Sequence, residues 1–126
     1  MAKILVVDDE PDIVRFVTKI LESRGHTVVT ATDGPDALMR VTNDAPDVVV
    51  LDVNIPRMDG FEVCRRIKSD PSTAHIPVVM MTAAYVRMED ARQGQSLGAD
   101  EYVIKPFLRE VLIHNVERLL AASAGV

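Results

Sequence analysis

The sequence has one cysteine, no run of basic residues and no long apolar stretch. A single cysteine, Cys64, forms no intramolecular disulfide, and it excludes a cysteine-rich metal site. The formal net charge of −5, without a basic run, argues against nucleic-acid binding by this chain itself. The apolar stretch at residues 4–7 is too short for a signal peptide or a membrane span. We therefore expect a protein of the reducing cytoplasm that does not bind membranes.

The sequence also lacks histidines at metal-ligand spacing and a glycine-rich phosphate-binding loop. His26, His75 and His114 lie in three separate predicted elements without ligand spacing, which argues against zinc and histidine-based catalysis. No glycine-rich loop follows the first predicted strand, where Asp8 and Asp9 would repel the phosphates of a dinucleotide or flavin unless a metal intervened. The chain has 126 residues, of which 48% are hydrophobic and 26% are charged. They predict one compact domain over residues 1–122 and a short tail over 123–126.

Short apolar runs alternate with longer amphipathic segments along the whole chain. The apolar runs predict strands over residues 3–7, 27–31, 48–51, 76–81 and 101–104. The amphipathic segments predict helices over residues 11–21, 36–43, 59–68, 88–97 and 107–122, with residues 33–35 forming a turn. Five strands, each followed by a helix, predict a doubly wound α/β fold. Its five-stranded parallel sheet would be covered by helices on both faces.

Polar side chains stand at the carboxyl ends of four of these strands. Asp8 and Asp9 follow the first strand, Asp52 follows the third, Thr82 ends the fourth and Lys105 follows the fifth. In an open parallel sheet these positions share one edge, where ligands bind. Three carboxylates that converge there repel one another unless one is protonated or a cation is bound. Mg²⁺, which prefers oxygen ligands, fits this site. The support for it lies in the placement of all these residues at one sheet edge, since each residue alone is a weak signal.

These residues suit phosphoryl transfer. A carboxylate oxygen of Asp52 can attack phosphorus in line and form an aspartyl phosphate. Mg²⁺, the Lys105 ammonium and the Thr82 hydroxyl would meet the charge on the phosphoryl oxygens. Asp9 would hold the metal directly, and Asp8 directly or through water.

One position argues against an alternative enzyme. A Mg²⁺-dependent phosphatase that attacks through aspartate needs a second acid two residues after the nucleophile. That position is Asn54, whose side chain cannot protonate a leaving group. Its backbone carbonyl, by contrast, lies where the chain turns back over the site and can coordinate the metal.

The chain resembles a response-regulator receiver domain of the CheY-like superfamily from end to end. The motifs that match are residues 4–10 (ILVVDDE), 51–60 (LDVNIPRMDG), 81–83 (MTA) and 98–107 (GADEYVIKPF). The resemblance implies the flavodoxin-like strand order 2-1-3-4-5. It also implies that Asp52 takes the phosphoryl group from a histidine kinase or a histidine phosphotransfer protein. Mg²⁺, or Mn²⁺ in its place, would bind Asp8, Asp9, Asp52 and the Asn54 carbonyl.

The resemblance assigns further roles as well. It implies a cis peptide bond between Lys105 and Pro106, and a conformational relay of Thr82 and Tyr102. The relay would reshape the face made by the fourth helix, fifth strand and fifth helix, which an effector protein or output domain reads. The same face is a candidate for dimerisation, which the sequence does not decide.

Asn54 and Ala84 match the positions that tune phosphate lifetime. In one departure from the family pattern, Thr82 lies one residue further upstream than usual, so the loop over residues 83–87 holds an extra residue. We expect a signalling phosphoacceptor and not an enzyme for external substrates. The remaining alternative is a receiver that binds partners without phosphorylation.

Overall fold

The computed structural model describes residues 2–83 and 98–124 of the chain. The helix predicted over residues 88–97 lies outside this part. The described residues form five strands and four helices, which follow one another in this order: β1 (Lys3–Val7), α1 (Pro11–Glu22), β2 (Thr27–Ala31), α2 (Gly34–Asp44), β3 (Val48–Asp52), α3 (Gly60–Ser69), β4 (Val78–Ala83), β5 (Glu101–Lys105) and α5 (Arg109–Ala124).

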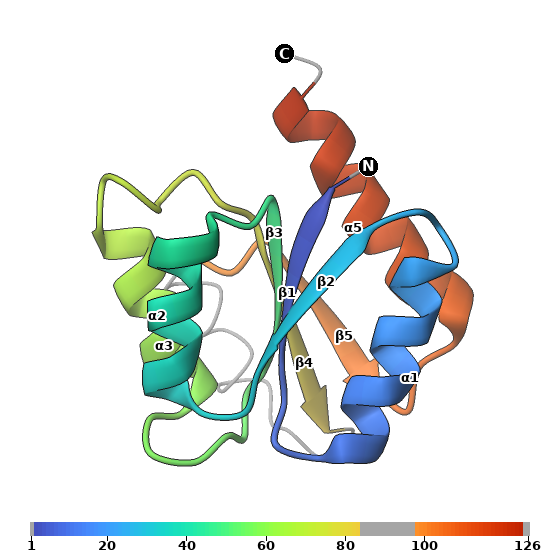
Figure 1. Ribbon diagram of the computed structural model, residues 1–126, viewed down its shortest axis with the longest axis horizontal. Helices are drawn as coiled ribbons and strands as arrows, with labels where there is room; N and C mark the ends of the chain where they lie inside the picture. The colour runs from blue at the N-terminus through green and yellow to red at the C-terminus, as the bar shows by residue number, and fades with distance from the viewer. Residues whose placement is uncertain (1, 84–97, 125–126) are drawn as a thin grey trace.

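All five strands run parallel in one sheet, in the order β2-β1-β3-β4-β5. This confirms the predicted fold class and strand order. Figure 1 shows the sheet between two layers of helices, with α2 and α3 on one side and α1 and α5 on the other. The central strand β3 is buried along its whole length, which explains why its sequence is a continuous apolar run.

The hydrophobic core has one layer on each face of the sheet. Successive strand side chains point to opposite faces, so Leu5 and Val49 pack towards α2 and α3. Ile4 and Val50 pack towards α1 and α5. Because both faces are covered, polar chemistry is confined to the edges where strands end.

The second helix begins earlier than the sequence predicted. The turn expected at residues 33–35 is the start of α2, which begins at Gly34. The Asp33 side chain caps this helix, since its Oδ1 accepts a hydrogen bond of 2.8 Å from the backbone N–H of Asp36. Pro35 lies in the first turn, where its missing N–H costs no helical hydrogen bond.

Strands β4 and β5 extend further towards the carboxyl edge than predicted. The fourth strand spans residues 78–83, and not 76–81, and the fifth ends at Lys105 instead of residue 104. The two shifts have one cause, because Ala83 pairs with Lys105 and Thr82 pairs with Ile104. Thr82 therefore lies inside the ladder and Lys105 is the last strand residue.

The last helix begins two residues later than predicted and ends two residues later, at Ala124. Phe107 packs against the ring of Phe16 on α1, with the ring centroids 5.9 Å apart, and stays outside the helix. Helical spacing alone predicts Leu108, Val111 and Leu112 on one buried side of this helix. Leu108 and Val111 are instead 69% and 42% exposed. The buried stripe of α5 is narrower than the pattern indicated and consists of Leu112, Val116 and Leu119.

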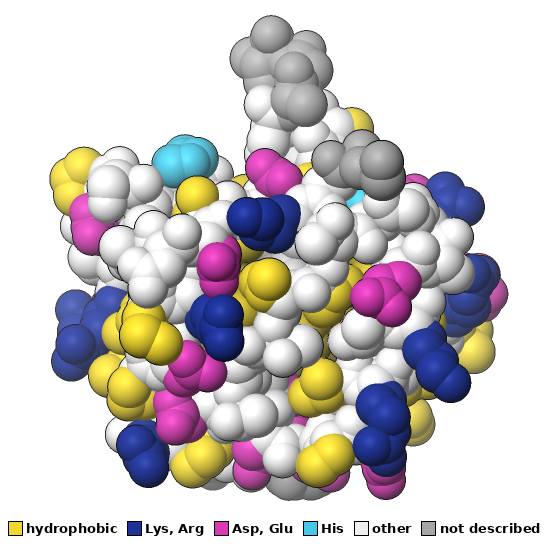
Figure 2. Space-filling view, in the orientation of Figure 1, with side chains coloured by type: hydrophobic (Ala, Val, Ile, Leu, Met, Phe, Trp, Pro, Cys, Tyr) yellow, Lys and Arg dark blue, Asp and Glu magenta, His cyan; other side chains and the backbone are white. Residues whose placement is uncertain are grey.

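Charges of both signs are spread over the surface. On the face shown in Figure 2, basic and acidic side chains are interspersed across α1 and α2. This distribution does not resemble the single-sign stripe of a nucleic-acid interface. No helix within residues 2–83 and 98–124 is both long enough and apolar enough to cross a membrane.

Candidate functional site

The strand register brings the predicted site residues to one edge. Val7 of β1 pairs with Leu51 of β3, so the residues that follow them, Asp8 and Asp52, emerge side by side. Asp52 in turn pairs with Met81 of β4. Thr82 of β4 pairs with Ile104 of β5, and Lys105 is the next residue of β5. The fold therefore brings together, at one sheet edge, residues from four strands that are far apart in the sequence.

Three carboxylates form a compact cluster at this edge. One oxygen each from Asp8, Asp9 and Asp52 lie within 4.8 Å of one another. Asp8 is fully buried and Asp52 is 5% exposed, whereas Asp9 faces solvent. Asp8 is held in place because its Oδ1 accepts a hydrogen bond of 3.0 Å from the backbone N–H of Glu10. The cluster presents the hard oxygen donors that Mg²⁺ prefers.

In the described part of the chain, the ammonium group of Lys105 faces these carboxylates. Lys105 Nζ donates a hydrogen bond of 2.9 Å to Asp8 Oδ2 and lies 3.1 Å from Asp52 Oδ1. It also lies 3.7 Å from Glu10 Oε1. The peptide bond between Lys105 and Pro106 is cis. Among residues 2–83 and 98–124, one positive charge thus contacts several negative ones.

Burial and neighbouring charges shift the pKa values of the two central residues, Asp52 and Lys105. Burial raises the pKa of Asp52 to about 6, and the negative charge of Asp8 adds to the rise, while Lys105 opposes it. The pKa of Lys105 is raised as well. Its burial lowers that pKa, but hydrogen bonds and charge from Asp8 and Asp52 outweigh the effect of burial. A divalent cation would offset both the burial of the Asp52 charge and its repulsion by Asp8.

The hydroxyl of Thr82 is the second donor that faces this edge. Thr82 is 5% exposed, and within the described part of the chain its Oγ1 has no hydrogen-bond partner. Buried hydroxyls are usually hydrogen-bonded, so this one, in the pocket that Asp52 also lines, is placed to contact a ligand. An oxygen-rich anion such as a phosphoryl group could accept this hydrogen bond.

The loop after β3 closes one side of the site. Asn54 is exposed and lines a pocket of about 810 Å³ together with Asp9, Asp52, Thr82 and Lys105. The other residues with predicted roles lie elsewhere. Tyr102 is half-buried and packs against the core layer on the α2 and α3 face. Ala84 and the loop residues up to 87 lie outside the described residues.

The structure adds residues that the sequence reasoning did not assign. Glu10 and Phe61 also line the pocket, and Glu10 contacts Lys105. Glu10 could have been suspected as the third member of an acidic run. Phe61 carried no such signal, because an aromatic residue in the first turn of a helix is ordinarily part of the core.

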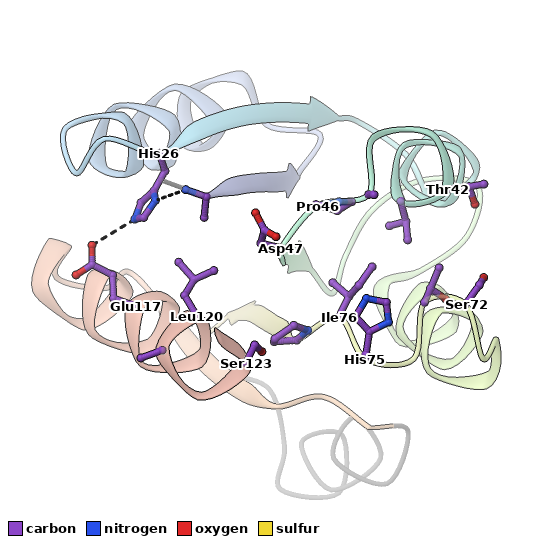
Figure 3. A pocket seen from close by; sticks show the side chains of 16 residues that line it. His26, Thr42, Pro46, Asp47, Ser72, His75, Ile76, Glu117, Leu120 and Ser123 are labelled. Carbon is purple, nitrogen blue, oxygen red and sulfur yellow. Dashed lines mark hydrogen bonds and ion pairs between the residues drawn. The ribbon is translucent and has the colours of Figure 1, made fainter. Parts of the chain in front are cut away.

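A second pocket, of about 880 Å³, lies at the opposite edge, where the strands begin (Figure 3). It contains His26 and His75, on separate elements as predicted. His26 Nδ1 accepts a hydrogen bond of 3.3 Å from the Ala2 N–H, and its Nε2 lies 3.3 Å from Glu117 Oε2. These contacts tie β1 to α5. Within the described residues, the only cluster with metal-ligating geometry is that of Asp8, Asp9 and Asp52.

A parallel sheet in this order, with carboxylates and a lysine at its carboxyl edge, is the arrangement expected of a receiver domain. Comparisons with known proteins agree. The family model of the response regulator receiver domain matches residues 4–117. The chain therefore belongs to the response regulator receiver family.

Individual relatives support this membership. The chain is 46% identical over 118 residues to the response regulator PleD of Caulobacter vibrioides, which covers 94% of this chain and 26% of that protein. It is 36% identical to protein PilH of Pseudomonas aeruginosa, with 96% of this chain and 99% of that protein covered. A solved receiver domain of a signal transduction histidine kinase from Syntrophus aciditrophicus superposes with a TM-score of 0.93 at 31% identity. It covers 100% of this chain and 95% of that one.

The relatives differ greatly in length. This chain spans about a quarter of PleD and about half of two transcriptional regulators that it also matches. The shared part is the receiver domain, and the activities of those longer proteins do not transfer with it.

Proposed function

We propose that this receiver accepts a phosphoryl group on Asp52 from a phosphohistidine of a sensor kinase or a histidine phosphotransfer protein. A carboxylate oxygen of Asp52 forms a bond to phosphorus as the bond from phosphorus to the imidazole nitrogen breaks. The imidazole leaves and an aspartyl phosphate remains. The chain promotes its own phosphorylation and dephosphorylation and acts on no external metabolite.

The carboxylate cluster supports a Mg²⁺ requirement. Asp8, Asp9, Asp52 and the backbone carbonyl of Asn54 would hold the ion, and Mn²⁺ could take its place. The bound ion would neutralise charge on the phosphoryl oxygens. The raised pKa of Asp52 is compatible with this requirement, since it reflects burial of the carboxylate and, second to that, the negative charge of Asp8.

The observation that carries the proposal is the contact of 3.1 Å between Lys105 Nζ and Asp52 Oδ1, in the pocket that Thr82 also lines; the Thr82 hydroxyl has no hydrogen-bond partner among the described residues. A phosphoryl group on Asp52 would add negative oxygens where an ammonium and a hydroxyl donor already stand. Donors preorganised in this way stabilise the charge that develops during transfer. Asn54 lines the same pocket and, with Ala84, would influence how long the phosphate survives.

Phosphorylation would then switch the face formed around β5 and α5. Thr82 would move towards the phosphoryl oxygens and Tyr102 would turn inward to follow it. Ile104 and Leu108 expose 58% and 69% of their surface, and such apolar residues suit a partner-binding face. An effector protein or an output domain would bind this face in the cytoplasm. The receiver itself would act as a monomer or as a phosphorylation-dependent dimer.

Intact-mass measurement tests the proposal. The protein would be incubated with Mg²⁺ and acetyl phosphate or phosphoramidate, with parallel samples of the Asp52→Asn variant and of wild-type protein in EDTA. We expect one added phosphoryl group in the wild type alone. No adduct after rapid quenching, together with no binding of beryllofluoride, would leave a binding module that works without phosphorylation.

A further inference from the structure

The loop that follows Asp52 is closed by a glycine. This loop, residues 53–59, joins β3 to α3 and carries Asn54. Its first residue is held to the sheet, because the Val53 N–H donates a hydrogen bond of 3.0 Å to the Met81 carbonyl. At its other end, the Gly60 N–H donates a hydrogen bond of 2.7 Å to the Val53 carbonyl. The start of α3 is therefore fixed directly against the end of β3.

No larger residue fits at position 60 in this arrangement. A Cβ atom on Gly60 would lie 2.3 Å from the backbone oxygen of Asp52 and 2.8 Å from Val53 Cα. These neighbours are backbone atoms of the strand that carries the phosphoacceptor, so no side-chain rotation relieves the overlap. An added methyl group would have to push apart the start of α3 and the end of β3.

We infer that Gly60 is a positioning residue for the cation site. Its missing side chain lets α3 close on Asp52 and so sets the path of the loop that holds the Asn54 carbonyl. Both the Asp52 carboxylate and this carbonyl would have to face the same ion, and Mg²⁺ tolerates little deviation from its preferred geometry. This inference rests on the proposed Mg²⁺-dependent function, and it adds a residue that touches neither the ion nor the phosphoryl group.

Gly34 provides a matched control. A Cβ atom there would lie 2.4 Å from Met58 Cβ and 2.6 Å from the Met58 carbonyl oxygen. The Gly34 N–H also donates a hydrogen bond of 3.3 Å to the Pro56 carbonyl. Gly34 thus meets the same loop with a similarly tight approach, but its contacts are with Pro56 and Met58 and not with the backbone of Asp52 or Val53. An alanine at this position strains the loop without reaching the phosphoacceptor.

Calorimetric titration with Mg²⁺ near pH 8 tests the assignment on wild type, Gly60→Ala and Gly34→Ala, with urea unfolding of each. Loss of a group that orients metal ligands typically weakens metal binding about 10- to 100-fold, and we expect Gly60→Ala to fall in this range. Gly34→Ala should bind Mg²⁺ as the wild type does, even where it loses as much stability. Equal weakening in both variants would trace the effect to general loop strain and overturn the role of Gly60.

Hydrogen exchange on the wild type covers the case in which Gly60→Ala does not fold. Saturation with Mg²⁺ should slow exchange of the Gly60 amide, because the bound ion would stabilise the arrangement in which this N–H donates to the Val53 carbonyl. Unchanged exchange at a saturated site would contradict the inference, as would wild-type affinity in Gly60→Ala. A wild type that binds no Mg²⁺ would instead overturn the metal site, and the proposed function with it.

Discussion

Lys105 Nζ lies 2.9 Å from Asp8 Oδ2, so a lysine ammonium stands against a fully buried carboxylate of the candidate cation site. The lysine compensates part of the charge that a divalent ion would otherwise neutralise. An ion that binds Asp8 has to share or displace this contact. Displacement would free the ammonium to face a phosphoryl group on Asp52.

We therefore expect Lys105→Met to bind Mg²⁺ more tightly than the wild type while it accepts phosphate more slowly. The substitution removes the competing positive charge and also removes a donor to the phosphoryl oxygens. Calorimetry near pH 8 would measure the first effect, and the rate of mass gain with phosphoramidate the second. Lys19→Met, which removes the same charge from an exposed position on α1, should change neither. Weaker Mg²⁺ binding by Lys105→Met would contradict this prediction and show that the lysine helps to position the carboxylates for the ion.

The charge of Asp52 should destabilise the folded protein at neutral pH and above. Raising a carboxyl pKa from 3.8 to about 6 corresponds to a penalty of roughly 3 kcal/mol above both values. In EDTA near pH 8, Asp52→Asn should therefore raise the free energy of unfolding by about 1 to 3 kcal/mol.

The same substitution predicts a pH dependence. As the pH falls through about 6, wild-type Asp52 takes up a proton in the folded state and the penalty shrinks. The stability gain of Asp52→Asn should therefore be full above pH 6 and nearly absent below the ordinary value of 3.8. Urea unfolding across this range would measure it. Asp12→Asn, at an exposed position on α1, should give no such gain, and a destabilised Asp52→Asn near pH 8 would contradict the electrostatic account.

The sequence predicted the layers of the fold and the residues that meet at its carboxyl edge because both depend on local patterns. Apolar runs that stop at Asp8 or Asp52 mark a strand end, and strand ends share one edge in a parallel sheet. The start of α5 was wrong because Phe107 packs against Phe16, a contact across the fold that helical periodicity does not encode. The close approach of Gly60 to Asp52 was missed for the same reason. The sequence around a glycine does not indicate which distant backbone atoms pack against it.

Cys64 should be chemically inert in the native protein. It is fully buried on α3, and burial raises the pKa of its thiol to about 11, although the charge of Lys68 opposes part of the rise. We expect no reaction with a thiol reagent such as DTNB near pH 8, and one equivalent of reaction once the protein is unfolded in urea. Rapid modification of the native protein would show that α3 opens far more readily than its packing indicates.

Lys68 should stabilise the fold without affecting the cation site. Its ammonium donates hydrogen bonds of 2.7 Å to the Ile76 carbonyl and 3.3 Å to the Ala74 carbonyl, and it lies 3.0 Å from Asp100 Oδ2. The same Asp100 oxygen accepts a hydrogen bond of 2.8 Å from the Val78 N–H. One lysine thus joins α3 to the segments that enter β4 and β5.

Lys68→Met would leave these acceptors without their charged partner. Because Lys68 is mostly buried, we expect a loss of about 1 to 3 kcal/mol in the free energy of unfolding. Urea denaturation would measure the loss, with Lys19→Met as the control for an exposed lysine. The affinity for Mg²⁺ should stay at the wild-type value, since the contacts of Lys68 lie at the edge where β4 and β5 begin. A variant as stable as Lys19→Met would mean that water replaces the ammonium at little cost.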